Sequence, residues 1–442
     1  MPVSFNYRLM LNLPPHLAHI TLKDLLKPPF LPCPSCGGEG LGVMTIGNHQ
    51  YSRRCYICGI TKRYPLPRLE KKVIYLDQFA ISNIAKQLSP NSKATRKDKH
   101  DEFFLKLFEV LDRLCKLQLA VCPESALHLH ESVVTGPHFE ALREVYSHLS
   151  YEVRMSRAEQ VLHSQITEAF QAWIDGESLS WPGERHIALD GSLDDWTNWL
   201  RFDLNYVLPG LAPELVARRD ARTKHLHTVC GHWQQMTPFS FKWVFESELR
   251  GFGEITINKY LRHLAKFEKA MRGEIPASEI AFEEPEATLM RNLVSMAQRV
   301  SNMHGGPLEI IRAFFASKAF RKVPYVKIWC LFWATLARVA RDMNPDHFPS
   351  GSLYNDLDVV AAYSPYCDAM FVDNEMENLA RQGDLRKCLA SGAKIFSLRS
   401  KDQFLEYLRG LESSAPQGHL DLVKEVYGPD AGTPYTTLLK RK

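Results

Sequence analysis

Residues 71–88 read KKVIYLDQFAISNIAKQL, and this stretch decides the predicted fold class. Val73–Leu76 is a short apolar run that ends at Asp77, which is typical of a buried strand. The following residues repeat apolar side chains at helical spacing, at Phe79, Ile81, Ile84 and Leu88. A buried strand followed directly by an amphipathic helix predicts one unit of a parallel α/β sheet.

The alternation of strands and helices continues along the chain. After the first unit we predict a helix over Glu102–Leu117, a strand over Leu119–Cys122, and a helix that Pro123 opens and that runs through Val134. Near the C-terminus we predict a helix over Asp356–Ala362 and strands over Ala369–Val372 and Lys394–Leu398. A long helical region from Pro307 to Asp342 is expected to bend at Pro324.

The middle of the chain loses the strand signals, and we interpret it as a helical insertion. The predicted organisation is an N-terminal segment at 1–30, a cysteine-containing module with a basic linker at 31–72, the first part of an α/β domain at 73–140, the insertion at 141–304, and the second part of the α/β domain with a tail at 305–442.

Composition sets limits on function. The 442 residues are 45% hydrophobic and 24% charged, which is ordinary globular usage, and the formal net charge is only +4. Nucleic-acid binding must therefore depend on local basic patches. No signal peptide and no long apolar run are evident, so we expect a soluble cytoplasmic protein.

Four cysteines form two metal knuckles. Cys33 and Cys36 are followed by Gly37, Cys55 and Cys58 are followed by Gly59, and eighteen residues separate the two pairs. This spacing predicts a zinc ribbon, in which Zn²⁺ closed by four thiolates is structural and leaves no position for substrate. The alternative is a pair of redox dithiols, which requires two such motifs by coincidence.

The predicted hairpin of this module and its linker are basic. Tyr51, Tyr56 and Tyr64 are interleaved with the basic residues, so phosphate contacts and base stacking together predict a nucleic-acid surface. The alternative is a solvated basic linker. The candidate nucleic-acid-binding residues are Arg53, Arg54, Lys62, Arg63, Lys71 and Lys72.

Acidic residues occur where predicted strands end and helices begin. The carboxyl ends of parallel strands line one crevice, so carboxylates distant in sequence converge there. Such a cluster needs divalent cations, and hard oxygen ligands select Mg²⁺ or Mn²⁺, which assist phosphodiester hydrolysis. The alternative is that each acid caps a turn or a helix. The candidates are Asp77, Glu131, Asp356, Asp358 and Asp373.

These elements together resemble PIN-like domain nucleases. The resemblance rests on Val73–Asp77 with the following QFAISN, on VCPES with His128 and Glu131, on NDLDVVAA at 355–362, and on YCDAMFVDN at 366–374. It implies a PIN-like parallel sheet flanked by helices, a metal-dependent nuclease activity, and RNA as a more favoured substrate than DNA. Carried over residue by residue, the Mg²⁺ or Mn²⁺ ligands would be Asp77, Glu131, Asp358 and Asp373.

Several positions compete within this scheme. Glu124 is a rival of Glu131, and His128 is expected to support Glu131 from the same helical face. Asp356 and Asp358 point about 200° apart on a helix, so only one faces the metal squarely. Asp368 lies about 16 Å from Asp373 along an extended strand, which makes it a structural residue or a support for the ligands.

Two further functions were weighed against the nuclease. The first is a non-catalytic nucleic-acid-binding or scaffold protein with a degenerate PIN-like fold, and the second is a metal-dependent phosphohydrolase acting on nucleotides. The helical insertion, which makes this chain longer than a compact PIN-like domain, is expected to hold substrate or to contact a protein partner or a second copy of the chain.

Overall fold

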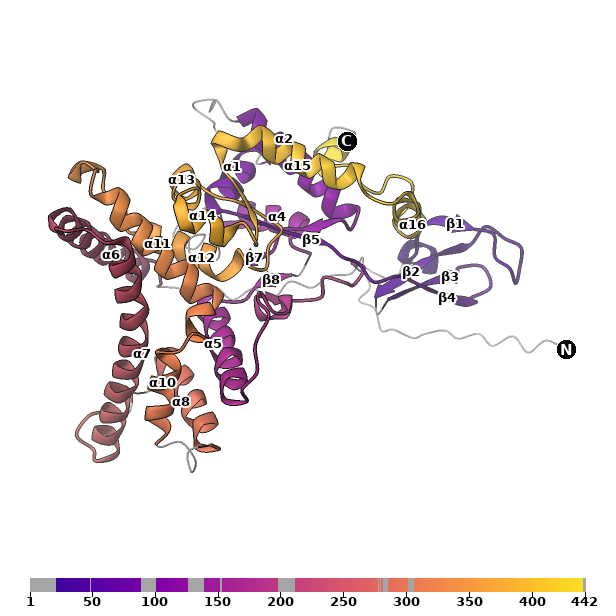
Figure 1. Ribbon diagram of the computed structural model, residues 1–442. Coiled ribbons are helices and arrows are strands. Elements are labelled where there is room, and N and C mark those ends of the chain that lie inside the picture. The colour runs from indigo at the N-terminus through magenta and orange to yellow at the C-terminus, as the bar shows by residue number, and fades with distance from the viewer. Residues whose placement is uncertain are drawn as a thin grey trace.

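The computed structural model describes residues 21–47, 49–88, 101–125, 139–151, 153–197, 211–276, 278, 280, 285–300 and 306–439. Its central sheet has the strand order β11–β10–β5–β6, and each neighbouring pair is parallel (Figure 1). The strands are β5 (Lys72–Leu76), β6 (Ala120–Val121), β10 (Ala369–Phe371) and β11 (Lys394–Phe396). The predicted α/β class with a parallel sheet is confirmed.

Alternate side chains of β5 enter two different cores, because successive residues of a strand point to opposite faces. Ile74 and Leu76 belong to one core, and Val73 and Tyr75 belong to the other. The first face is covered by α1 (Gln78–Leu88), α2 (Asp101–Lys116), α4 (Phe139–Leu149) and α15 (Lys401–Ser413). The second is covered by α11 (Pro324–Ala340), α12 (Leu353–Tyr363), α13 (Asn374–Ala380) and α14 (Gly383–Leu389).

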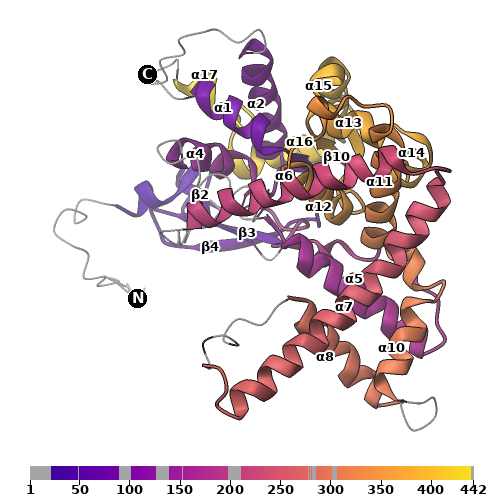
Figure 2. The same ribbon diagram turned by 90° about the vertical axis from the view of Figure 1, so that its left-hand side faces the viewer.

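The middle of the chain is largely helical, and most of it forms a lobe toward the bottom of Figure 2. The helices of the lobe are α5 (Ala158–Ile174), α7 (Phe241–Met271), α8 (Pro285–Gln298) and α10 (Pro307–Phe315). α6 (Leu211–Gln235) instead crosses the middle of that view and packs in the core beside the sheet. α5, α7, α8 and α10 share a core with Val326 and Cys330 of α11. Because α11 also contributes to the core beside the sheet, it joins the lobe to the α/β domain.

Three sequence-based expectations need correction. The region Pro307–Asp342 is not one bent helix but two helices, α10 and α11, with η6 (Phe320–Lys322) between them. Pro324 lies in the first turn of α11. Its missing N–H is tolerated there, because the first N–H groups of a helix have no partner within the helix. The middle segment contains two strands, β8 (Arg154–Met155) and β9 (Leu189–Asp190). They form a small sheet with β7 (Glu124–Ser125), which replaces the start of the helix predicted after Pro123. The rest of that helix, 126–134, lies outside the described residues.

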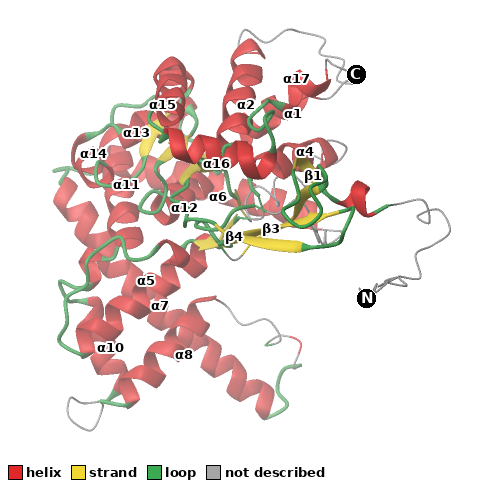
Figure 3. Ribbon diagram, turned by 90° about the vertical axis from the view of Figure 1, so that its right-hand side faces the viewer, coloured by secondary structure: helices red, strands yellow, loops and turns green. Residues whose placement is uncertain are grey.

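An antiparallel sheet precedes β5 and packs against the C-terminal part of the chain (Figure 3). Its strands are β1 (Lys27–Leu31), β2 (Leu41–Gly47), β3 (Gln50–Cys55) and β4 (Thr61–Pro65). The basic linker before β5 is therefore shorter than predicted, because the first residues assigned to it belong to β4. α16 (Gln417–Tyr427) lies against β1. The remaining elements are η2 (Leu22–Leu25), η4 (Arg185–Ile187), η7 (Pro345–His347), η8 (Leu398–Ser400) and α17 (Tyr435–Leu439).

Among the helices that the structure describes, none combines the length and the apolar composition that a bilayer crossing requires.

Candidate functional site

Asp77 and Asp373 lie at the carboxyl ends of neighbouring strands. Leu76 of β5 is in register with Phe371 of β10, and the Asp77 N–H donates to the Phe371 carbonyl at 2.9 Å. The Asp77 carbonyl accepts the N–H groups of Ala80 and Ile81, which starts α1. The Asp373 Oδ1 accepts the Met376 N–H at 2.7 Å and caps α13. The sheet thus brings these two predicted site residues to the same edge, where Asp373 has one oxygen engaged in a cap.

Asp356 and Asp358 lie on different faces of α12. Asp356 shares a face with Tyr363, two helical turns later, and the Tyr363 ring lies 5.8 Å from the Tyr75 ring of β5. The Oδ1 of Asp358 accepts the Tyr325 hydroxyl of α11 at 2.5 Å. Burial raises the pKa of Asp358 to about 6, although the Tyr325 hydrogen bond acts in the opposite direction. Asp358 is therefore engaged by α11, about 200° around the helix from Asp356.

The other acidic candidates are placed as follows. Glu131 and His128 lie outside the described residues. Glu124 is buried in β7, three residues beyond the end of β6. Asp368 lies at the opposite end of β10 from Asp373 and accepts from Lys72 Nζ at 3.0 Å, from Arg185 at 2.9 Å and from the Val73 N–H at 2.9 Å. These contacts make Asp368 a structural residue that fixes β10 to β5.

Among the described residues, no three carboxylate oxygens from the predicted acids lie within 4.8 Å of one another. The groups of metal-ligating type that do reach this separation are Cys33, Cys36, Cys55 and Cys58, and His49 with Asp194 and Asp195. In the second group, each ring nitrogen of His49 faces a different carboxylate, at 3.5 and 3.9 Å. Arg68 also lies 3.5 Å from Asp194, so this group is an ion-pair cluster between the β2–β3 turn and the loop that follows β9.

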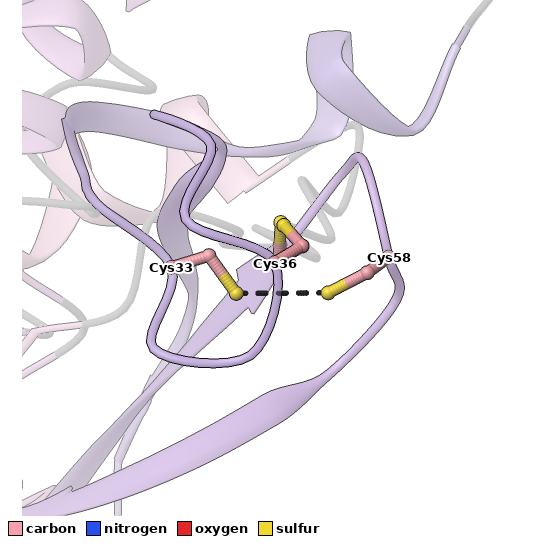
Figure 4. Close-up of side chains that lie close together, drawn as sticks. Cys33, Cys36 and Cys58 are labelled. Atoms are coloured by element: carbon pink, nitrogen blue, oxygen red, sulfur yellow. Dashed lines mark hydrogen bonds between the residues drawn. The ribbon is translucent and has the colours of Figure 1, made fainter.

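The four cysteine sulfurs lie within 4.8 Å of one another. Figure 4 shows three of these side chains, Cys33, Cys36 and Cys58, which come from two similar turns. The Cys33 and Cys58 sulfurs lie 3.6 Å apart, and those of Cys36 and Cys55 lie 3.8 Å apart. Tetrahedral Zn²⁺ with Zn–S bonds of about 2.3 Å requires sulfurs about 3.8 Å apart. The sulfur separations therefore fit a zinc ion.

The backbone of the two turns supports this convergence. The Gly37 N–H donates to the Cys33 carbonyl at 2.8 Å, and the Gly59 N–H donates to the Cys55 carbonyl at 2.9 Å. Gly37 and Gly59 have φ values of +72° and +77°, which other residues rarely adopt. Burial raises the pKa of Cys33, but hydrogen bonds from backbone N–H groups and neighbouring thiols outweigh burial and lower this pKa to about 6.

The pKa of Cys36 is instead raised to about 11, because burial and hydrogen bonds from the neighbouring thiols outweigh a backbone hydrogen bond at Gly38. The lowered value at Cys33 comes from the N–H groups of Cys36 and Ser35. The hydrogen bonds at Cys33 therefore favour the thiolate, which is the form that binds metal.

Two of the predicted nucleic-acid-binding residues are structural. Arg53 is fully buried and donates to the carbonyls of Pro29, Leu41 and Glu425. Lys71 is 4% exposed and donates to the Asp195 carbonyl at 2.8 Å, and burial lowers its pKa to about 8. These two assignments were wrong, because a basic side chain enclosed by backbone carbonyls has no surface to offer a phosphate.

The remaining basic residues differ in exposure. Lys62 and Arg63 of β4 are exposed, and Arg54 is half-buried on the neighbouring strand. Lys72 is partly exposed, but its charge is paired with Asp368. Tyr51 is buried and donates its hydroxyl to Glu425, with its ring stacked on that of Tyr64 at 5.0 Å. The basic surface of this sheet is therefore centred on β4.

A cavity of about 950 Å³ lies between α5, α7, α8, α11 and α12. Asp358 lines it, together with aromatic side chains of α11 and α12 and basic side chains of α5, α6 and α7. This cavity was not predicted from the sequence. Its lining comes from residues between Arg157 and Tyr363 on six helices, and no local spacing signals such an assembly.

Comparisons of this chain with protein-family models, with curated proteins and with solved structures found no match.

Proposed function

We propose that this protein is a metal-dependent nuclease of the PIN-like class, with RNA as its favoured substrate and with a zinc ribbon that assists nucleic-acid binding. The observation that carries the proposal is the meeting of Asp77 and Asp373 at one sheet edge, through the Leu76–Phe371 register and the hydrogen bond from Asp77 to Phe371. In a parallel α/β sheet this edge is where ligands bind.

The residues at this edge suit a hard divalent cation. Asp77 and Asp373 supply carboxylate oxygens from neighbouring strands, and Asp373 keeps its Oδ2 beyond the oxygen that caps α13. Asp356 is the better α12 ligand in this proposal, because the Asp358 carboxylate is engaged by Tyr325 of α11. Glu131 remains the predicted fourth carboxylate. When bound, Mg²⁺ or Mn²⁺ would lower the pKa of a water and stabilise the leaving oxygen of a phosphodiester.

The antiparallel sheet provides the substrate-binding surface in this proposal. Its four cysteines have sulfur separations that match a structural Zn²⁺, so the ion would hold the sheet and take no part in the reaction. Lys62 and Arg63 are exposed on β4 and are available to phosphates. β4 is joined to β5 by residues 66–71, which ties this surface to the strand that ends at Asp77.

The test is cleavage of labelled single-stranded RNA, transfer RNA, single-stranded DNA and duplex DNA in the presence of Mn²⁺. We expect Asp77→Asn and Asp356→Asn to lose activity by about two orders of magnitude or more, as expected when a group acting in the transition state is removed. Asp421→Asn, an exposed residue of α16, serves as the matched control and should cleave like the natural chain. Equal cleavage by Asp77→Asn and the natural chain would reject the site.

One observation favours a second function. No three of the predicted acids in the described part of the chain lie within 4.8 Å of one another, which suits a non-catalytic nucleic-acid-binding protein. That protein would bind RNA through β4 and would cleave nothing with any divalent cation. Binding lost in Lys62→Ala with Arg63→Ala, together with absent cleavage, would establish this second function in place of the first.

A further inference from the structure

The cavity between α5, α7, α8, α11 and α12 contains a carboxylate to which the described residues offer no partner. Glu248 of α7 is half-buried, and no hydrogen bond or ion pair reaches it from the residues that the structure describes. Burial raises the pKa of Glu248. A second carboxyl group, Asp358, lines the same cavity and accepts the Tyr325 hydroxyl. A half-buried carboxylate without a hydrogen bond is unfavourable, so a ligand that donates a hydrogen bond to it gains affinity.

Aromatic side chains form one wall of the cavity. The Trp329 ring stacks on that of Tyr325, with centroids 5.9 Å apart and an angle of 14° between the planes. Trp329 is only half-buried, and Tyr354 lines the cavity beside it. A flat aromatic wall next to an unpaired carboxylate suits a planar ring that carries N–H groups at its edge.

Among the described residues, Arg157, Arg222 and Lys259 are cations that line the cavity, and Arg222 has no acidic partner in this part of the chain. Lys259 is paired with Glu286 at 2.5 Å, and Arg157 lies 3.9 Å from Glu159. Arg222 instead donates to the amide oxygen of Asn355 at 2.7 Å and lies 5.7 Å from the centre of the Tyr354 ring. Arg222 is exposed, so its guanidinium is available to an anionic group at the mouth of the cavity.

We propose that this cavity binds a guanine nucleotide. The guanine ring would lie against Trp329, its adjacent ring N–H and amino group would donate to the two oxygens of Glu248, and its phosphate would meet Arg222. Among the four common bases, guanine alone presents two neighbouring donors that match a carboxylate. A polyamine would satisfy Glu248 but would bring no anion to Arg222, whereas a nucleotide carries donors and an anion together.

The volume and the position of the cavity agree with this assignment. Its 950 Å³ is within the range of about 300–1,000 Å³ for small-molecule sites. Asp358 lines it, but Asp77, Asp356 and Asp373 do not, so it is distinct from the proposed metal edge. The inference therefore stands whether or not the protein is a nuclease. The nucleotide is either free or part of a strand, since both present the same base and phosphate.

The experiment is titration calorimetry of the full chain with 5′-GMP, AMP, CMP, UMP and spermidine, without added Mg²⁺ or Mn²⁺. We expect saturable binding of one 5′-GMP per chain, at least tenfold tighter than that of any other probe. Glu248→Gln should weaken 5′-GMP binding about tenfold or more, because a charged hydrogen-bond acceptor is lost. Guanosine without phosphate should bind more weakly than 5′-GMP, and this difference should disappear in Arg222→Gln.

The matched control is Glu254→Gln, an exposed residue of α7 that does not line the cavity, and it should bind 5′-GMP like the natural chain. A tetranucleotide with one guanosine that competes with 5′-GMP would assign the cavity to a strand, and its failure to compete would assign it to a free nucleotide. Equal binding of all four nucleotides, tighter binding of spermidine, an unchanged affinity in Glu248→Gln, or no binding of 5′-GMP at millimolar concentration would each overturn the proposal.

Discussion

Arg53 carries a full charge, yet backbone carbonyls from three separate parts of the chain enclose its guanidinium. It reaches Pro29 on β1, Leu41 at the start of β2 and Glu425 on α16. A single side chain thus joins the antiparallel sheet to the C-terminal helix. The residues next to Arg53 in sequence do not predict this structural role, because its partner Glu425 is 372 positions away.

Replacing Arg53 by methionine is expected to lower the free energy of unfolding by about 2–4 kcal/mol, since buried carbonyls lose their charged donor. Urea unfolding of the purified variant measures the loss. Arg63→Met, on exposed β4, is the control and should stay within about 0.5 kcal/mol of the natural chain. Similar losses in both variants would mean that Arg53 is no more structural than a surface residue.

Lys71 makes stability depend on pH at the alkaline end. Burial lowers its pKa in the folded chain from 10.5 to about 8, so the unfolded chain binds more protons between these values. Stability attributable to Lys71 therefore rises as the pH goes from about 8 to 10.5, and the gain is at most about 3 kcal/mol. Lys71→Met should remove this rise relative to Lys62→Met, measured by urea unfolding across that range.

At the scale of elements, the cysteine module and β5 were accessible from sequence because their signals are local. The knuckles are defined by spacing within a few residues, and β5 is defined by four apolar residues before Asp77. The pair β8 and β9 was not accessible, because strands of two residues have no period to detect. The acidic residues at the sheet edge were predicted in part. The strand ends at Asp77 and Asp373 were predicted, but the hydrogen bond that engages Asp358 of α12 was not.

The cysteine module should contain one tightly bound zinc ion per chain, measurable by elemental analysis of the purified protein. Cys58→Ser is expected to lose this zinc and to raise amide exchange across β2 and β3, while β5 and β10 keep their protection. Cys388→Ser, a cysteine of α14 outside the module, should keep the zinc. Full zinc content in Cys58→Ser would exclude the four-thiolate site.

At the scale of the whole molecule, α12 contributes to both proposed sites. Asp358 lines the cavity, whereas Asp356 is not one of the lining residues. The cavity could not be predicted from the sequence, because its lining comes from six helices that are distant from one another in sequence. The features predicted correctly from the sequence are single strands and helices. The cavity was not predicted, because it depends on contacts between distant segments.

The two sites should respond to different ligands. Mn²⁺ should raise the thermal midpoint of the natural chain and of Glu248→Gln but not of Asp77→Asn, whereas 5′-GMP should raise that of Asp77→Asn but not of Glu248→Gln. Each ligand at about 100 times its dissociation constant adds about 2.7 kcal/mol of stability. Thermal unfolding with each ligand measures this pattern, and loss of both responses in a single variant would contradict two separate sites.

The pairing of β5 with β10 also dictates an order of events on the ribosome. Val73 and Asp368 are joined by a hydrogen bond although 295 positions separate them, so β5 emerges long before its neighbour exists. At about 5–20 residues per second, translation of the intervening chain takes about 15–60 s. During that time the apolar strand β5 has no neighbour on the side that later pairs with β10. Co-expressed chaperones that capture such strands are therefore expected to increase the yield of soluble protein.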